Sequence, residues 1–169
     1  AYIAGKRESR RLLGDYVLKE GDITTYNLQE DASCATTWSI DLHYPDPENT
    51  KYFPGNEFKA ICKQETIYPY PIPYRCLYSR NINNLFMAGR NISVTHVALG
   101  TVRVMRTTGM MGEVVGMAAS LCKKHNVEPR TIYWKYFPEM KALMKEGVGK
   151  KDLPNNQTYN MGGSKEHKP

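Results

Sequence analysis

The sequence lacks a long apolar run, a signal peptide and a glycine-rich nucleotide fingerprint. No apolar stretch approaches the roughly 18 residues that a membrane-spanning helix needs, so we expect a soluble protein with no membrane partner. The opening residues 1–7 contain neither an initiator Met nor a long apolar segment, which favours a chain cut from a longer protein and leaves its localisation unknown. No G-x-G-x-x-G occurs, so no segment predicts the turn that receives a dinucleotide pyrophosphate.

Cysteine is scarce and irregularly spaced. Cys34, Cys62, Cys76 and Cys122 stand 28, 14 and 46 residues apart, and none forms a C-x-x-C pair. Zinc and redox motifs use closely spaced thiols, so the spacing predicts no metal site. Scattered buried thiols are the favoured interpretation, although the even count leaves disulfides open.

Acidic residues are fewer than basic ones: 17 Asp and Glu against 23 Lys and Arg give a formal charge of +6. A basic surface attracts nucleic acid or anionic ligands. Much of the excess, however, lies in residues 6–11 and after Lys141, without the interleaved aromatic rings that stack bases. We therefore expect a solvated basic surface and no nucleic-acid partner.

The composition is otherwise that of a globular protein, with 41% hydrophobic and 24% charged residues in 169 residues. This length holds one domain or part of a larger one. Short β-rich runs at 16–18 and 38–40 predict strands between polar turns. Residues 22–28 predict a short helix with Asp22 as its N-cap.

Proline and tyrosine concentrate in the middle of the chain, with six of each between Tyr44 and Tyr78. Proline lacks a backbone donor, so the alternating segment 68–74 predicts extended chain or an edge strand and excludes a central strand. Two interpretations stay open. The segment is either a rigid surface connection or the wall of a substrate cavity, where Tyr offers an apolar face and a hydroxyl.

The most regular pattern follows. Residues 84–89 form a short apolar run that predicts a buried strand, and apolar residues with helical spacing predict a helix over 108–124. Thr107 or Thr108 would cap this helix, and Asn126 would end it in the left-handed conformation. A polar loop is expected between the strand and the helix, and a short terminal helix over 138–146.

Three glycines, Gly109, Gly112 and Gly116, lie in the first turns of the predicted helix, where each costs about 1 kcal/mol relative to Ala. Close approach of a ligand to the first-turn N–H groups would explain Gly109. Gly112 and Gly116 would instead let the helix lie against a strand or another helix. A strand, a loop and a glycine-rich helix form the arrangement at which α/β proteins bind nucleotides.

At these residues the sequence resembles the C-terminal FAD segment of the FAD-dependent oxidoreductases. The resemblance is carried by NLFMAGRNIS at 84–93, THVALGTVRVMR at 95–106 and GEVVGMAA at 112–119. Residues 7–16 and 72–75 extend it, so that it covers roughly residues 5–125. It implies a flavoprotein of the glutathione-reductase-like superfamily, in a branch whose bacterial members often carry the label xanthan lyase.

The resemblance implies a fold of the α+β or α/β class, namely the C-terminal segment of a two-domain FAD-binding flavoprotein. Residues 1–80 would belong to a β-rich substrate domain, and 81–125 would supply the last strand and helix of a Rossmann-type FAD domain. Residues 126–150 would form an extension and 151–169 a flexible tail. Because the pyrophosphate motif is absent, we expect FAD in the full-length protein and an inactive isolated chain, whose partner is the missing N-terminal segment or a second copy.

The implied function is hydride transfer between a small organic substrate and the flavin. The expected cofactor-binding residues are Gly89, Arg90, Thr108, Gly109, Met110, Met111 and Gly112. The expected catalytic residues, lying near flavin and substrate, are His96, Arg103 and Arg106, since a cationic group favours hydride acceptance. The candidates for substrate binding are Arg7, Arg10, His43 and Tyr74.

Two alternatives belong to other functional classes. A carbohydrate-acting protein, in line with the xanthan lyase label, would use Tyr74 or His43 as a base and Arg75 to neutralise a sugar acid. A noncatalytic remnant would instead bind a partner along an open sheet edge.

Overall fold

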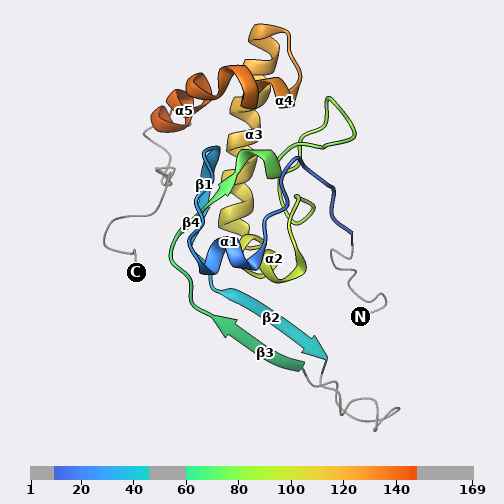
Figure 1. Ribbon diagram of the computed structural model, residues 1–169, viewed down its shortest axis with the longest axis vertical. Coiled ribbons are helices and arrows are strands. Elements are labelled where there is room, and N and C mark those ends of the chain that lie inside the picture. Colours follow the sequence, from blue (N-terminus) through green and yellow to red (C-terminus); the bar gives the residue numbers. More distant parts are fainter. Residues whose placement is uncertain (1–9, 46–59, 148–169) are drawn as a thin grey trace.

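The structure is a computed structural model that describes residues 10–45 and 60–147 (Figure 1). Its helices are α1 (Glu20–Thr24), α2 (His96–Val102), α3 (Met105–His125), α4 (Pro129–Thr131) and α5 (Phe137–Glu146). Its strands are β1 (Ala32–Thr36), β2 (Ile40–Pro45), β3 (Ala60–Glu65) and β4 (Tyr70–Pro73). A 3-10 turn, η2 (Tyr74–Cys76), follows β4, and a π-helical turn, η3 (Ile132–Tyr136), separates α4 from α5. The described residues thus form an α+β structure with small antiparallel sheets.

Strands β1 and β4 pair antiparallel, with Ala35 opposite Pro71 and Thr36 opposite Tyr70, and side chains along both strands are buried. A two-stranded sheet has only edge strands, so β4 tolerates prolines that have no N–H to donate. The prediction of extended or edge chain over 68–74 is therefore confirmed for β4. Tyr70 and Tyr74 serve the core, since both are fully buried, whereas Tyr68 is exposed.

Strands β2 and β3 form a second antiparallel pair, with Ile40 opposite Glu65 and His43 opposite Cys62. Figure 1 shows this pair extending beyond α1 and α2, at the opposite end of the molecule from α4 and α5. Its contact with the rest of the fold runs through β2 and α2. The pair therefore presents much of its surface to solvent.

Helix α3 passes behind the β1–β4 sheet and packs against β1 and α5 (Figure 1). Its buried face carries Met111, Val114, Ala118 and Leu121, as the helical spacing predicts. The helix begins three residues earlier than predicted. A cap at Thr107 or Thr108 is wrong, because the extended backbone of Val104 starts the helix. The stop is confirmed, with Asn126 at φ 51° and ψ 53°.

The predicted strand at 84–89 is wrong for the described structure. Only a short pairing forms there: Ser79 N donates to Leu85 O at 2.9 Å and Met87 N donates to Leu77 O at 2.8 Å, around one bridge between Tyr78 and Phe86. Two residues of pairing are too few for a strand ladder. The turn then closes at Gly89, whose φ of 120° suits a residue without a Cβ.

Two further helices depart from the predictions: α2 was not expected, and α1 begins and ends earlier than predicted. The expected polar loop contains α2, which Thr95 caps by accepting from Ala98 N. Helix α1 begins at Glu20, so the prediction of Asp22 as its N-cap is wrong. Asp22 is the third residue of the helix, and its carboxylate accepts a hydrogen bond from Lys19 N at 2.9 Å. The predicted terminal helix at 138–146 is confirmed as α5.

One hydrophobic core joins the described segments. Leu18, Tyr74, Val94, Met111 and Met140 are all buried in it, so residues on both sides of position 80 pack together. The division of the chain into substrate and FAD domains stays a prediction. Among the described helices, none is both long and apolar enough to cross a membrane.

A buried ion pair ties this core together. The Asp31 side chain is fully buried and accepts from Arg75 N at 2.8 Å and from Arg75 Nε and Nη2 at 2.9 Å. The Arg75 guanidinium also lies over the rings of Tyr16 and Tyr133. The pair therefore links the start of β1, the turn after β4, and the C-terminal helices.

Replacing Arg75 with Met should lower the free energy of unfolding by about 3–5 kcal/mol, because the Asp31 carboxylate would stay buried without its partner. Urea denaturation measures the change. The matched control is Lys124→Met, which removes an exposed ion pair to Glu139 and should leave the free energy of unfolding almost unchanged, because water and salt screen such pairs. Equal losses in the two variants would contradict the role given to Asp31.

Candidate functional site

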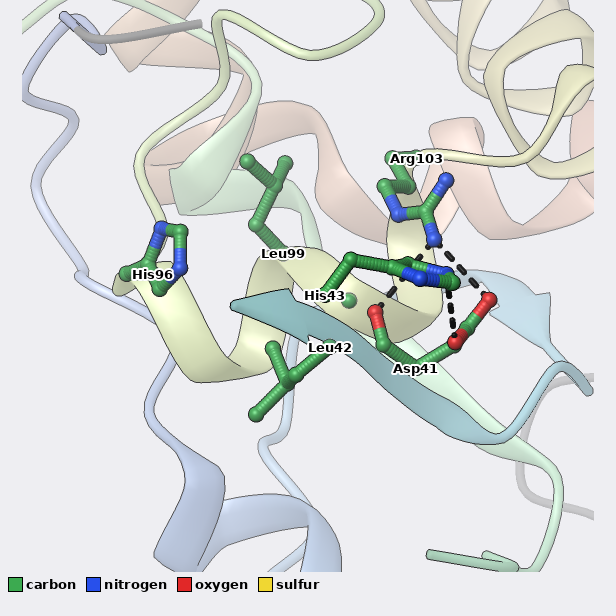
Figure 2. Close-up of a pocket in the computed structure, with 7 residues that line it drawn as sticks. Asp41, Leu42, His43, His96, Leu99 and Arg103 are labelled. Carbon is green, nitrogen blue, oxygen red and sulfur yellow. Dashed lines mark hydrogen bonds and ion pairs between the residues drawn. The ribbon is translucent and has the colours of Figure 1, made fainter. Parts of the chain in front are cut away.

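A small hollow of about 180 Å³ lies between β2 and α2 (Figure 2). Strand β2 contributes Asp41, Leu42 and His43, and α2 with its C-cap contributes His96, Leu99, Gly100 and Arg103. The hollow is polar on one side, where His43 and Arg103 turn toward Asp41, while His96 stands apart at the start of α2. We call it the β2–α2 hollow.

Gly100 sets how closely α2 approaches β2. A Cβ at this position would lie 2.9 Å from Asp41 N and 3.0 Å from Asp41 O, and backbone atoms cannot give way cheaply. Gly100 is also buried, on the side of α2 that faces β2. The absence of a side chain here therefore brings Arg103 within reach of Asp41.

The Asp41 carboxylate is the anchor of this hollow. Arg103 Nη2 donates to Asp41 Oδ2 at 2.9 Å and to the Asp41 carbonyl at 3.3 Å, and His43 Nε2 lies 3.0 Å from Oδ1. Desolvation favours the neutral acid, but hydrogen bonding with Gln64 and the electrostatic influence of the neighbouring His43 and Arg103 side chains outweigh it and lower the pKa of Asp41. Asp41 is thus a carboxylate at neutral pH, and it holds the Arg103 guanidinium in place.

A second, more open hollow of about 590 Å³ lies at the first turn of α3. It is lined by Ala88, Gly89, Arg90, Arg103, Met105, Thr108 and Gly109. A Cβ at Gly109 would meet no atom within 4 Å among the described residues, so the backbone of α3 is accessible from this side. We call it the α3 hollow. Arg103 lines both hollows and joins them.

The structure brings many of the predicted site residues together. His43, His96 and Arg103 share the β2–α2 hollow, although the sequence separates His43 from the other two. Gly89, Arg90, Thr108 and Gly109 share the α3 hollow.

Other predicted residues lie elsewhere. Met110 and Met111 are buried in the core, where Met111 Sδ accepts from Gly89 N at 3.4 Å. Arg106 and Gly112 are exposed on α3 and line neither hollow, and Arg10 is exposed in the N-terminal segment. The roles of these residues stay predictions.

Tyr74 and Arg7 complete the set. The Tyr74 hydroxyl donates to Pro129 O at 2.9 Å, and burial raises the pKa of Tyr74, which opposes ionisation of the phenol. This tyrosine lines neither hollow. Arg7 lies outside the described residues.

Two expectations about α3 are corrected. Because the helix begins at Met105, Thr108 N already donates to Val104 O at 3.0 Å, and the N–H groups without helical acceptors belong to residues 105–107. Gly112 and Gly116 were expected to pack against a strand or helix. A Cβ at either would meet no atom within 4 Å in the described part of the chain, so that expectation is wrong there.

Asp41 was missed, although the sequence contained a signal for it. Asp41 and His43 stand two apart in an extended segment, and side chains at that spacing share one face of a strand. The partnership with Arg103 spans 62 residues and has no local signal.

Comparison with protein families gives one match that covers most of the chain. The family model described as FAD dependent oxidoreductase matches residues 1–145. The chain belongs to the FAD-dependent oxidoreductase family. Searches of curated proteins and of solved structures returned no match. Family membership confirms the resemblance read from the sequence, while the wider superfamily and the xanthan lyase label stay predictions.

The close approach at Gly100 can be tested by a single methyl group. Gly100→Ala should lower the free energy of unfolding by about 1–3 kcal/mol, since the methyl group would collide with the Asp41 backbone. Gly116→Ala is the matched control in α3 and should raise stability by about 1 kcal/mol, because it gains helix propensity without a collision. Urea denaturation curves of both variants decide the matter, and a stabilised Gly100→Ala would refute the close packing.

Proposed function

We propose that this chain forms the substrate-facing part and the flavin edge of an FAD-dependent oxidoreductase that transfers hydride between a small organic substrate and FAD. The observation that carries the proposal is the position of Arg103, which lines two adjacent hollows of different size. A redox flavoenzyme needs its substrate and cofactor in contact, and one cation shared by two hollows suits that requirement. Membership of the flavin family supports the choice of cofactor.

The α3 hollow has the properties that a flavin edge requires. Its wall at Gly109 is bare backbone, which lets a planar ring approach closely. Arg90 and Arg103 bring positive charge, and the first turn of α3 carries the positive end of the helix dipole. Bound FAD supplies a ring that accepts a hydride and becomes negatively charged, which these groups favour. Arg90, Thr108 and the backbone at Gly89 and Gly109 would hold it.

The β2–α2 hollow would receive the substrate. Its volume of about 180 Å³ suits a small molecule. Arg103 can bind a carboxylate or carbonyl oxygen through its other donors, because Nη2 makes the contacts to Asp41. His96 lies on the opposite wall, where its imidazole is positioned to take or give a proton. His43 completes the polar wall.

The cofactor's pyrophosphate requires a further segment in this proposal, since the chain contains no G-x-G-x-x-G. The full-length protein should therefore purify with FAD, whereas the 169-residue chain alone should hold flavin weakly and lose it on gel filtration. Absorbance spectra of the two preparations make the comparison. A colourless full-length protein that cannot be reconstituted with FAD would refute the proposed function.

The placement of the flavin at α3 has its own test in the full-length protein. Gly109→Val puts a branched side chain into the α3 hollow and should weaken FAD binding by about tenfold, equivalent to about 1.4 kcal/mol, or clearly shift the flavin reduction potential. Gly116→Val is matched, because both glycines lie in α3 with no atom within 4 Å of an added Cβ in the described structure. The two variants share the same change in helix propensity, which favours Val slightly over Gly.

Of these two glycines, Gly109 lines the α3 hollow and Gly116 does not, so Gly116→Val should retain the parent's FAD affinity and flavin reduction potential. FAD titration followed by fluorescence, together with the reduction potential, measures both variants. If Gly109→Val leaves affinity and potential unchanged, the flavin does not lie against this turn of α3.

A further inference from the structure

The β2–β3 pair gathers three side chains with metal-ligating atoms. Asp41, His43 and Cys62 place a carboxylate oxygen, an imidazole nitrogen and a thiol sulfur all within 4.8 Å of one another. Within residues 10–45 and 60–147 this is the only such group of three. It arises from strand geometry: Asp41 and His43 share one face of β2, and Cys62 stands directly opposite His43 on β3.

Two of the three ligand distances are close to those around a single tetrahedral ion. Zinc–ligand bonds of about 2.0–2.3 Å place neighbouring ligand atoms about 3.3–3.6 Å apart. Here Asp41 Oδ1 lies 3.0 Å from His43 Nε2 and 3.7 Å from Cys62 Sγ. The third pair, His43 and Cys62, has its ligand atoms within 4.8 Å, and both side chains are exposed, so they have room to move toward a shared ion.

We propose that Asp41, His43 and Cys62 form a binding site for a divalent ion of the zinc type. Thiolate, imidazole and carboxylate are the three ligand types that zinc combines in proteins. One thiolate and one carboxylate balance the two charges of the ion, so the occupied site is neutral. The inference does not depend on the proposed flavin function, because it rests on these three ligands alone.

Arg103 already orients the carboxylate. Arg103 Nη2 donates to Asp41 Oδ2, and Oδ1 faces His43 (Figure 2). The same Oδ1 accepts from Cys62 Sγ. Partners of this kind fix the geometry of metal ligands. Three protein ligands also leave one tetrahedral position for water or for an oxygen of a molecule in the β2–α2 hollow, since Asp41 and His43 line that hollow.

The thiol proton occupies the place that the ion would take. Cys62 Sγ donates to Asp41 Oδ1 at 3.7 Å, so the thiol proton lies between these two ligand atoms. Binding breaks the S–H bond, forms a metal–sulfur bond and releases one proton to the buffer, with no change of oxidation state.

The test uses purified full-length protein, freed of metal with a chelator, kept reduced and titrated with Zn²⁺ by calorimetry in buffers of different ionisation enthalpy. We expect one ion per chain and release of a proton. Co²⁺ in place of zinc should give the charge-transfer absorption of a cobalt–thiolate bond. Cys62→Ser and His43→Gln should each weaken zinc binding by more than the roughly 10–100-fold that is lost when a residue hydrogen-bonded to a metal ligand is removed.

Two matched variants serve as controls. Cys122→Ser removes a partly exposed thiol that lies outside the cluster, and His96→Gln removes an imidazole on the other wall of the hollow. Both should bind zinc like the parent, and circular dichroism confirms that all four variants fold. The proposal is overturned if Cys62→Ser and His43→Gln retain parent affinity, or if the cobalt complex lacks the thiolate band. FAD binding is not measured here, so failure of the metal site leaves the flavin proposal separately testable.

Discussion

The ion pair between Asp31 and Arg75 is the constraint on which the rest of the structure depends. Asp31 is fully buried, so its carboxylate requires a partner, and Arg75 supplies three donors from the turn that follows β4. The pair fixes where β1 begins relative to where β4 ends, while Tyr74 N donates to Asp31 O beside it. With the Arg75 guanidinium over Tyr16 and Tyr133, one cation holds segments from both ends of the described chain against the sheet.

The site inherits its geometry from that sheet. Thr36, at the end of β1, is buried, and its hydroxyl donates a hydrogen bond to the carbonyl of Thr101 in α2 at 2.8 Å. Gly100 beside it brings α2 against the first residues of β2. Arg103, the C-cap of α2, then meets Asp41. The cation shared by the two hollows is therefore positioned by regular elements that are themselves fixed to the core, which limits its freedom to move when a ligand binds.

The sequence predicts features whose cause is local. The spacing of apolar residues in α3, the left-handed stop at Asn126 and the proline in the first turn of α5 depend on a few neighbouring residues. The strand predicted at 84–89 does not form because a strand requires a partner of matching length, and here only Tyr78 and Phe86 pair. The site was partly predicted, because the family resemblance selected His96 and Arg103. The contacts of Asp41 with Arg103 and of Cys62 with Asp41 join residues 62 and 21 positions apart, and no local pattern predicts them.

Asp41 connects the two proposed chemistries without forcing them to compete. Its Oδ2 binds Arg103, the residue shared by both hollows, while Oδ1 faces His43 and Cys62. An ion on Oδ1 would leave Oδ2 bonded to Arg103, while the positive charge of the ion would offset part of the attraction between the Asp41 carboxylate and the guanidinium. Arg103 would then offer more of its charge to a substrate or to the flavin edge. Metal binding at the β2–β3 pair would in this way strengthen the cationic character of the adjoining hollows, because the two sites share one carboxylate.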